Sequence, residues 1–245
     1  MKPNISVVVP VYNSEYSLDE LCGRLIYILS QMCFRYELLL VDDGSNDKSY
    51  NKMLELHKNN NHIKAIQLRG NFGQQNALIC GFHYAVLDYV VTMDDDLQHP
   101  PEEIPKLYEK ILEGYDIVYG IPIKKQHSSY RNLGTKATDL LFDKLCSKPH
   151  NIKVNSFRIM KKELVQRIIL DKTSFVYLSA MTFKNTNKVA NVYVNHNCRK
   201  YGKSNYTFLK LFKLYTKLYI YYSSCSLFKI FKSKRSQFIV KDIQL

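Results

Sequence analysis

The 245-residue sequence lacks the cysteine patterns that hold metals or build a disulfide framework. Its six cysteines form no C-x-x-C pair and no metal-ligand spacing with histidine, so we expect reduced, mostly buried thiols of a cytosolic protein. A basic-then-apolar signal sequence is also missing after Met1, and this predicts that the chain is not secreted.

Long apolar runs and glycine-rich loops are missing as well. A membrane-spanning helix needs roughly 20 mainly apolar residues, and the nearest candidate, residues 218–231, is interrupted by Lys229 and three serines. We therefore predict no transmembrane helix. Neither G-x-G-x-x-G nor G-x-x-x-x-G-K-[ST] occurs, which argues against a dehydrogenase or a P-loop protein.

Acidic residues are absent from residues 199–241, where eleven Lys or Arg side chains alternate with eleven aromatic ones and contribute to the net charge of +13. Such a segment favours a polyanion or an anionic membrane surface. Residues 208–222 repeat apolar side chains at i, i+3, i+4 and i+7, with lysines on another face. This pattern predicts an amphipathic helix, either lying on the inner membrane leaflet or packed on the domain. We place the domain boundary between residues 1–205 and the C-terminal extension 206–245.

The rest of the chain alternates predicted strands and helices. Strands are expected at residues 5–11, 36–41, 63–68, 89–93 and 116–120, and helices at 18–33, 47–58, 74–87 and 100–113, with Ser45 or Asn46 as the cap of the second helix. This βαβα order predicts an α/β fold with a mostly parallel sheet flanked by helices. Beyond it we expect a loop at 124–130, a helix at 131–146, a strand at 154–160, helices through 184 and a strand at 189–196.

Polar residues follow four of these strands, at 12–13, 42–43, 69–73 and 94–98. Ligands of doubly wound sheets bind beyond the carboxyl ends of the strands. In a strand, Asp94 and Asp96 would point to one side and Asp95 to the other. Two carboxylates in one small volume favour Mg²⁺ or Mn²⁺ with sites open for phosphate oxygens, although an acidic loop or helix cap is the simpler alternative. The four loops together favour a metal that holds a nucleotide diphosphate.

Seven motifs extend this interpretation to a family. They are V-V-V-P-V-Y-N at 7–13, V-D-D-G-S at 41–45, N-F-G-Q-Q-N-A-L at 71–78, M-D-D-D-L-Q-H-P-P-E-E-I-P at 93–105, E-G-Y-D-I-V at 113–118, S-F-R at 156–158 and R-K-Y-G-K-S-N-Y at 199–206. Together they resemble family 2 glycosyltransferases of the Rossmann-like GT-A fold. The resemblance is strongest to the polyprenyl-phosphate branch that includes dolichol-phosphate mannose synthases.

The resemblance implies a donor site and a metal site. Metal ligands would be Asp94, Asp96 and Gln98, holding Mg²⁺ or Mn²⁺. The UDP-, GDP- or dTDP-linked sugar would contact a larger set: Pro10, Tyr12, Asn13, Asp42, Asn71, Gly73, Asn76, Asp94 and Asp95. Within this set, Pro10, Tyr12 and Asp42 would line the nucleoside pocket. Family 2 members invert at the anomeric carbon, so a single in-line displacement is expected. His99, which follows the acidic triplet, is either a further ligand or a structural residue.

The resemblance also implies an acceptor site, whose arginines would be catalytic residues together with Asp96. Arg131, Arg158 and Arg199 would hold a lipid phosphate, whose charged oxygen needs positioning but no general base. A surface ion pair is the alternative for each arginine. The chain departs from the family pattern at Asp95, Asn155 and Lys203, and the last two belong to the motifs that contain Arg158 and Arg199.

We therefore expect a metal-dependent, inverting glycosyltransferase that uses polyprenyl phosphate, bound peripherally on the cytoplasmic face of the membrane and able to meet a membrane-protein partner there. A lipid-linked saccharide acceptor of surface polysaccharide assembly and an inactive sugar-nucleotide binder are the alternatives. A nucleotidyltransferase usually carries a glycine-rich, lysine-containing N-terminal loop, which residues 10–14 do not form. Nucleic-acid binding would leave the acidic site unexplained. The sequence leaves the base, the sugar and the oligomeric state undetermined.

Overall fold

The computed structural model describes residues 2–123, 149, 151–197, 216–217, 220–222 and 236–245. The expected loop at 124–130, the expected helix at 131–146 and most of the amphipathic segment 208–222 lie outside these residues. Within that segment, residues 216–217 and 220–222 are helical. In the described part of the chain, no helix is both long enough and apolar enough to span a membrane.

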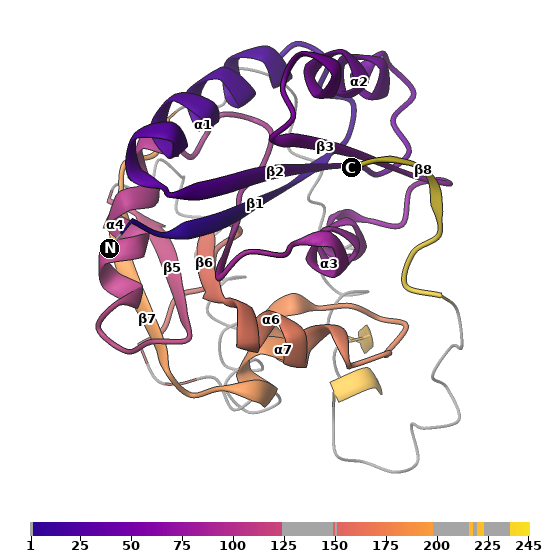
Figure 1. The fold of residues 1–245 in the computed structure, drawn as a ribbon. Coiled ribbons are helices and arrows are strands. Elements are labelled where there is room, and N and C mark those ends of the chain that lie inside the picture. The colour runs from indigo at the N-terminus through magenta and orange to yellow at the C-terminus, as the bar shows by residue number, and fades with distance from the viewer. Residues whose placement is uncertain (1, 124–148, 150, 198–215, 218–219, 223–235) are drawn as a thin grey trace.

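One mixed sheet forms the centre of the domain (Figure 1). Its strand order is β7-β5-β6-β4-β1-β2-β3-β8. Strands β6 and β8 run antiparallel to their neighbours, and the other pairs are parallel. The sheet is therefore mostly parallel, as predicted. The strands are β1 Asn4–Val11, β2 Arg35–Asp42, β3 Ile63–Leu68, β4 Tyr89–Thr92, β5 Ile117–Pro122, β6 Arg158–Lys161, β7 Val189–Val194 and β8 Val240–Gln244.

Helices cover both faces of the sheet, as Figure 1 shows. Helices α1 (Leu18–Met32), α2 (Ser49–Asn59) and α4 (Ile104–Ile111) pack on one face, with the short 3₁₀ turn η1 (Pro101–Glu103) before α4. Helices α3 (Gln74–Tyr84), α6 (Lys162–Ile169) and α7 (Leu178–Asn185) pack on the other. The central strands face both layers with apolar side chains, because alternate residues point to opposite faces.

Helix α3 lies close against β1 and β2. A Cβ atom on Gly81 would overlap the side chain of Val8, so a larger residue at this position would push the helix away from the sheet. The close packing places the N-terminal end of α3 beside the carboxyl ends of the parallel strands. This position matters for the candidate site.

Strand β8 was not predicted, and it lies in the expected extension. It pairs antiparallel with β3, the Tyr50 hydroxyl lies 2.7 Å from the Asp242 carboxylate, and the Arg69 N–H donates to the Ile239 carbonyl at 2.9 Å. The sequence of this segment has no continuous apolar run, because an edge strand is less covered than a central one. Residues 240–244 therefore belong to the same sheet as β1–β7.

Candidate active site

The acidic triplet lies at the carboxyl end of β4, beside the loops that follow β1, β2 and β3. Strand β4 ends at Thr92, so Asp95 and Asp96 occupy a turn, and Leu97 adopts a positive φ of 60°. The chain leaves the strand before the triplet, so strand alternation does not set these side chains, although Asp94 and Asp95 bond to different partners. Asp94 and Asp96 each add to the rise in the pKa of Asp95, so the three charges lie close together.

Asp94 is held from two sides. Its Oδ1 accepts a hydrogen bond of 2.5 Å from Gln74 Nε2 at the start of α3, and its Oδ2 accepts one of 2.7 Å from Ser156 Oγ. Burial raises the pKa of Asp94, against the lowering by the Ser156 hydrogen bond, and the charge of Asp96 raises it further. Asp94 is thus a fixed carboxylate in a negative environment, a setting that favours a bound cation.

Asp95 connects the acidic turn to the loop after β1. Its Oδ2 accepts hydrogen bonds from Ser14 Oγ at 2.5 Å and from the Tyr12 N–H at 3.2 Å. Burial raises the pKa of Asp95 to about 6, although both hydrogen bonds oppose the rise. The aspartate that departs from the family pattern therefore fixes the position of the loop that carries the predicted nucleoside residues.

Asp96 and Gln98 complete the predicted metal site. Asp96 Oδ1 accepts the Gln98 N–H at 3.1 Å, while the Gln98 carbonyl accepts the Asn197 N–H at 2.8 Å. Within the described ranges, no group of three or more His, Cys, Asp or Glu side chains is arranged to hold a metal. Two carboxylates and an amide still suit Mg²⁺ or Mn²⁺, since such ions take one or two carboxylates and complete their coordination with water and phosphate oxygens.

The predicted nucleoside residues lie at the ends of β1 and β2. Tyr12 is 43% exposed and can meet a ligand, whereas Pro10 is buried within β1. Asp42 is fully buried, and its carboxylate accepts hydrogen bonds from the Ser45 N–H at 3.1 Å and from Gln67 Nε2 at 3.2 Å. In this arrangement Asp42 holds the turn after β2, and its contact with a nucleoside stays a prediction.

The loops after β1 and β2 are bonded to each other. Asn13 N–H donates to Ser45 Oγ, and Asn13 Oδ1 accepts the Asn46 N–H, both at 2.9 Å. Neither Ser45 nor Asn46 caps α2, so the predicted cap was wrong. Their polar groups hold the two loops together instead, and α2 begins only at Ser49, whose N–H donates to Asp47 Oδ1.

Asp43 holds the loop after β3, a role that the sequence analysis missed. Its carboxylate accepts the N–H groups of Phe72 at 2.7 Å and Gly73 at 2.8 Å. Burial raises the pKa of Asp43 to about 6, against the lowering by these two bonds. The V-D-D-G-S motif was a signal for this residue, but only the structure shows which loop it binds.

Asn71, Gly73 and Asn76 surround the start of α3 and line a cavity of about 1040 Å³. Asn71 is exposed, and Asn76 Nδ2 donates to the Phe72 carbonyl at 2.6 Å. Asn76 Oδ1 is buried without a hydrogen-bond partner in the described part of the chain. These three predicted donor residues therefore form a group apart from Tyr12 and Asp42.

Of the three predicted acceptor arginines, Arg131 and Arg199 lie outside the described residues. Arg158 is 2% exposed, with its Nε donating to Thr92 Oγ1 at 3.1 Å and its guanidinium 5.8 Å from the centre of the Tyr119 ring. The positive charge of Arg158 lowers the pKa of Asp94 and so favours the ionised form of that carboxylate. Its contact with an acceptor phosphate stays a prediction.

His99 packs as an aromatic residue behind the acidic turn. It stacks on Phe157 with ring centres 5.1 Å apart and meets His196 edge-on at 4.8 Å. Burial lowers the pKa of His99 to about 4, and the nearby His196 contributes to the shift. The ring is therefore neutral near pH 7, and these contacts agree with the structural alternative.

The family model described as Glycosyl transferase family 2 matches residues 6–178, which include the acidic turn and all four loops. The chain belongs to glycosyl transferase family 2. Its GT-A fold is shared by glucosyl-3-phosphoglycerate synthase from Mycobacterium tuberculosis, solved with Mn²⁺, UDP and phosphoglyceric acid, at a TM-score of 0.64 and 18% identity over 89% of this chain and 76% of that one. The complex of that enzyme with Mn²⁺, UDP-glucose and phosphoglyceric acid gives a TM-score of 0.65 and 17% identity, over 89% and 78% of the two chains.

Curated relatives of this family 2 chain include two undecaprenyl-phosphate 4-deoxy-4-formamido-L-arabinose transferases. The protein from Pectobacterium carotovorum is 37% identical and that from Proteus mirabilis 39% identical, each over 214 residues that cover 86% of this chain. The alignments span 65% of the length of these relatives, slightly less than two thirds.

Proposed function

We propose that this chain is a metal-dependent, inverting glycosyltransferase that moves a sugar from a nucleotide-sugar to polyprenyl phosphate. The main support is the acidic turn at the end of β4. Asp95 ties this turn to the loop that carries Tyr12, and Gln74 ties it to the start of α3. The loop that carries Tyr12 would hold the nucleoside and the acidic turn would hold the diphosphate, and hydrogen bonds connect these two segments.

The donor half of the proposal rests on the chemistry of the site. Asp94 and Asp96 would hold Mg²⁺ or Mn²⁺, with Gln98 as a further oxygen ligand, and the bound ion would neutralise charge on the departing diphosphate. Tyr12 would pack against the base, while Asp42 and Asp43 keep the surrounding loops in place. UDP is the first donor nucleotide to test, since the structural neighbours were solved with UDP or UDP-glucose.

The acceptor half rests on the relatives and on the charge of the chain. Both curated relatives carry a name that specifies undecaprenyl phosphate. A phosphate nucleophile is ionised at neutral pH and needs positioning by cations rather than a general base. Arg131 and Arg199 are the proposed contacts, with Arg158 supporting the turn. The Asn197 N–H donates to the Gln98 carbonyl, so the described chain up to residue 197 lies at the metal turn.

The proposed location is the cytoplasmic face of the membrane, where a polyprenyl phosphate head group is accessible. The excess of 35 Lys and Arg over 22 Asp and Glu favours an anionic lipid surface. The basic, aromatic segment 206–235 would contact that surface, while β8 holds the end of the chain to the sheet.

Turnover tests the proposal. UDP-, GDP- and dTDP-sugars would be incubated with short-chain polyprenyl phosphate and Mg²⁺ or Mn²⁺, with Asp96→Ala as the inactive control and Asp88→Ala as a surface carboxylate control. Release of nucleoside diphosphate that needs both lipid and metal supports the proposal. Release of nucleoside diphosphate only with a lipid-linked saccharide would instead support a transferase of polysaccharide assembly.

A further inference from the structure

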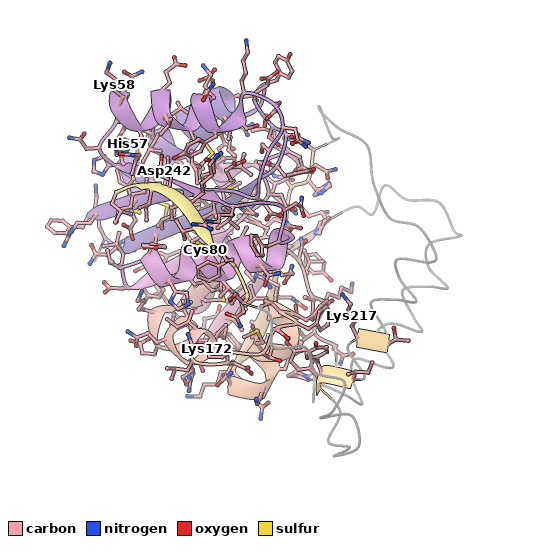
Figure 2. The ribbon with its side chains drawn as sticks, turned by 90° about the vertical axis from the view of Figure 1, so that its right-hand side faces the viewer. His57, Lys58, Cys80, Lys172, Lys217 and Asp242 are labelled. Atoms are coloured by element: carbon pink, nitrogen blue, oxygen red, sulfur yellow. The ribbon has the colours of Figure 1, made fainter. Side chains whose placement is uncertain are left out.

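The cavity at the start of α3 has three walls that come from distant parts of the sequence. Residues 71–76 form one wall, residues 174–177 before α7 form the second, and the C-terminal residues 217, 221, 236, 237 and 239 form the third. Figure 2 shows Lys217 on a short helical piece beside the body of the domain. The cavity measures about 1040 Å³, the size of a site for a substantial ligand.

Hydrogen bonds hold the C-terminal wall in place. The Tyr222 hydroxyl donates to the Phe175 carbonyl at 2.9 Å and accepts the Tyr177 N–H at 3.2 Å. Gln237 Nε2 donates to the carbonyls of Asp171 at 2.9 Å and Thr173 at 2.8 Å. The C-terminal wall is therefore part of the folded domain.

The lining suits an anionic amphiphile. None of the described lining residues is acidic, and Lys217 supplies a cation whose Nζ lies 5.4 Å from the centre of the Phe175 ring. Carboxamide side chains lie at the start of α3, where the Phe72 and Gly73 N–H groups are bound by the Asp43 carboxylate. The remaining walls are largely aromatic or aliphatic, as the tail of a lipid requires: Phe72, Phe175, Val176, Tyr177, Tyr221 and Ile239.

The cavity adjoins the acidic turn. Gln74 lines the cavity and donates to Asp94 at 2.5 Å, so a head group bound at the start of α3 would lie beside the metal site. The nucleoside loop is tied to the same turn through Asp95. Donor and acceptor would thus approach the turn through different elements, as an in-line displacement needs.

We infer that this cavity is the acceptor subsite, taking the phosphate and the adjoining prenyl unit of the lipid, with Lys217 as a phosphate contact. This inference rests on the proposed function. It moves Asn71, Gly73 and Asn76 from a purely donor role to the wall that the two substrates share.

Direct binding tests the inference without turnover. A fluorescent farnesyl phosphate would be titrated into the full chain, and its dissociation constant measured by anisotropy. Ser236→Trp fills the cavity from an exposed position, and Lys217→Glu reverses its charge. The matched controls are Ser30→Trp on the surface of α1 and Lys241→Glu on β8, both exposed and outside the cavity. Binding of UDP, GDP or dTDP, whichever the wild type binds, reports an intact fold.

The inference predicts at least a tenfold weaker farnesyl phosphate affinity for both cavity variants, with both controls and Lys217→Arg within twofold of the wild type. Nucleotide affinity should stay within twofold throughout. An unchanged lipid affinity in the cavity variants, or no binding by the wild type, would overturn the inference. Weaker nucleotide binding instead of weaker lipid binding would assign the cavity to the donor and also overturn it. A wild type that binds the lipid through these residues but transfers no sugar would keep the lipid-phosphate site and refute the transferase proposal.

Discussion

Replacing Gly44 with alanine should destabilise the fold and weaken donor binding together. Gly44 lies in the V-D-D-G-S loop at a φ of 72°. An added Cβ would lie 2.5 Å from the carbonyl carbon of Gly70 and 2.9 Å from the Asn71 nitrogen. Both neighbours are backbone atoms, so no side-chain rotation can relieve the overlap.

The expected cost has two parts. A left-handed conformation costs a residue with a Cβ about 1–2 kcal/mol, and overpacking against fixed atoms costs about 1–3 kcal/mol more. The sum of about 2–5 kcal/mol corresponds to a fall in Tm of roughly 4–20 °C for a domain of this size. The loop after β3 would also shift, because Asp43 binds it through Phe72 and Gly73, so nucleotide affinity should fall as well.

Two other glycines separate these contributions. Gly114 has a φ of 104° with no atom within 4 Å of the added Cβ, so Gly114→Ala measures the conformational cost alone. Gly23 lies within α1 with open space and no positive φ, so Gly23→Ala should stabilise the protein by up to about 1 kcal/mol. Urea unfolding and nucleotide titration would be measured for all three. The reasoning is refuted if Gly44→Ala costs no more than Gly114→Ala, or if it leaves nucleotide affinity unchanged.

Three further predictions concern the loops and strand β8. Asp95→Ala should raise the donor KM about tenfold, equivalent to about 1.4 kcal/mol, with kcat within twofold, because the β1 loop loses two hydrogen bonds; a fall in kcat alone would contradict this. Asp43 has a folded-state pKa of about 6, above its ordinary value, so its protonated form favours folding and its contribution is lost as pH rises through 6. The wild type should therefore lose about 2 kcal/mol of unfolding free energy relative to Asp43→Asn between pH 4 and pH 7, measured by urea unfolding; parallel pH profiles would refute the assignment. Tyr50→Phe should speed amide hydrogen exchange in residues 240–244, with α1 unchanged, because β8 loses its bond to Asp242; equal exchange rates would show that strand pairing alone holds β8.

Much of the fold could be predicted because its parallel strands carry a strong local signal. The run at 5–11 is apolar at nearly every position, and a strand buried on both faces requires this pattern. Strand β8 gave no such signal, because only Val240 and Ile243 of its five residues are apolar and its partner, β3, lies more than 170 residues away in the chain. Long-range pairing of an edge strand is set by the open edge it covers rather than by its own sequence.

The site could be located from the sequence, but its internal contacts could not. Motifs at the strand ends placed Asp94 and Asp96 at one edge of the sheet, and the structure confirms that position. The hydrogen bonds of Asp95 and Asp43 depend on the turn after Thr92 and on the path of the loop at 70–73. Neither is encoded by side-chain periodicity, which describes regular elements only.

Metal-dependent transfer tests the central proposal most directly. With the donor sugar identified, the wild type would be incubated with polyprenyl phosphate, and the glycosylated lipid and the nucleoside diphosphate would both be measured with and without EDTA. The proposal predicts equal amounts of the two products, loss of both with EDTA and recovery on adding Mn²⁺ or Mg²⁺, with no product from Asp96→Ala. Transfer that continues at the wild-type rate in Asp96→Ala, or that is indifferent to EDTA, would contradict the assignment of the acidic turn.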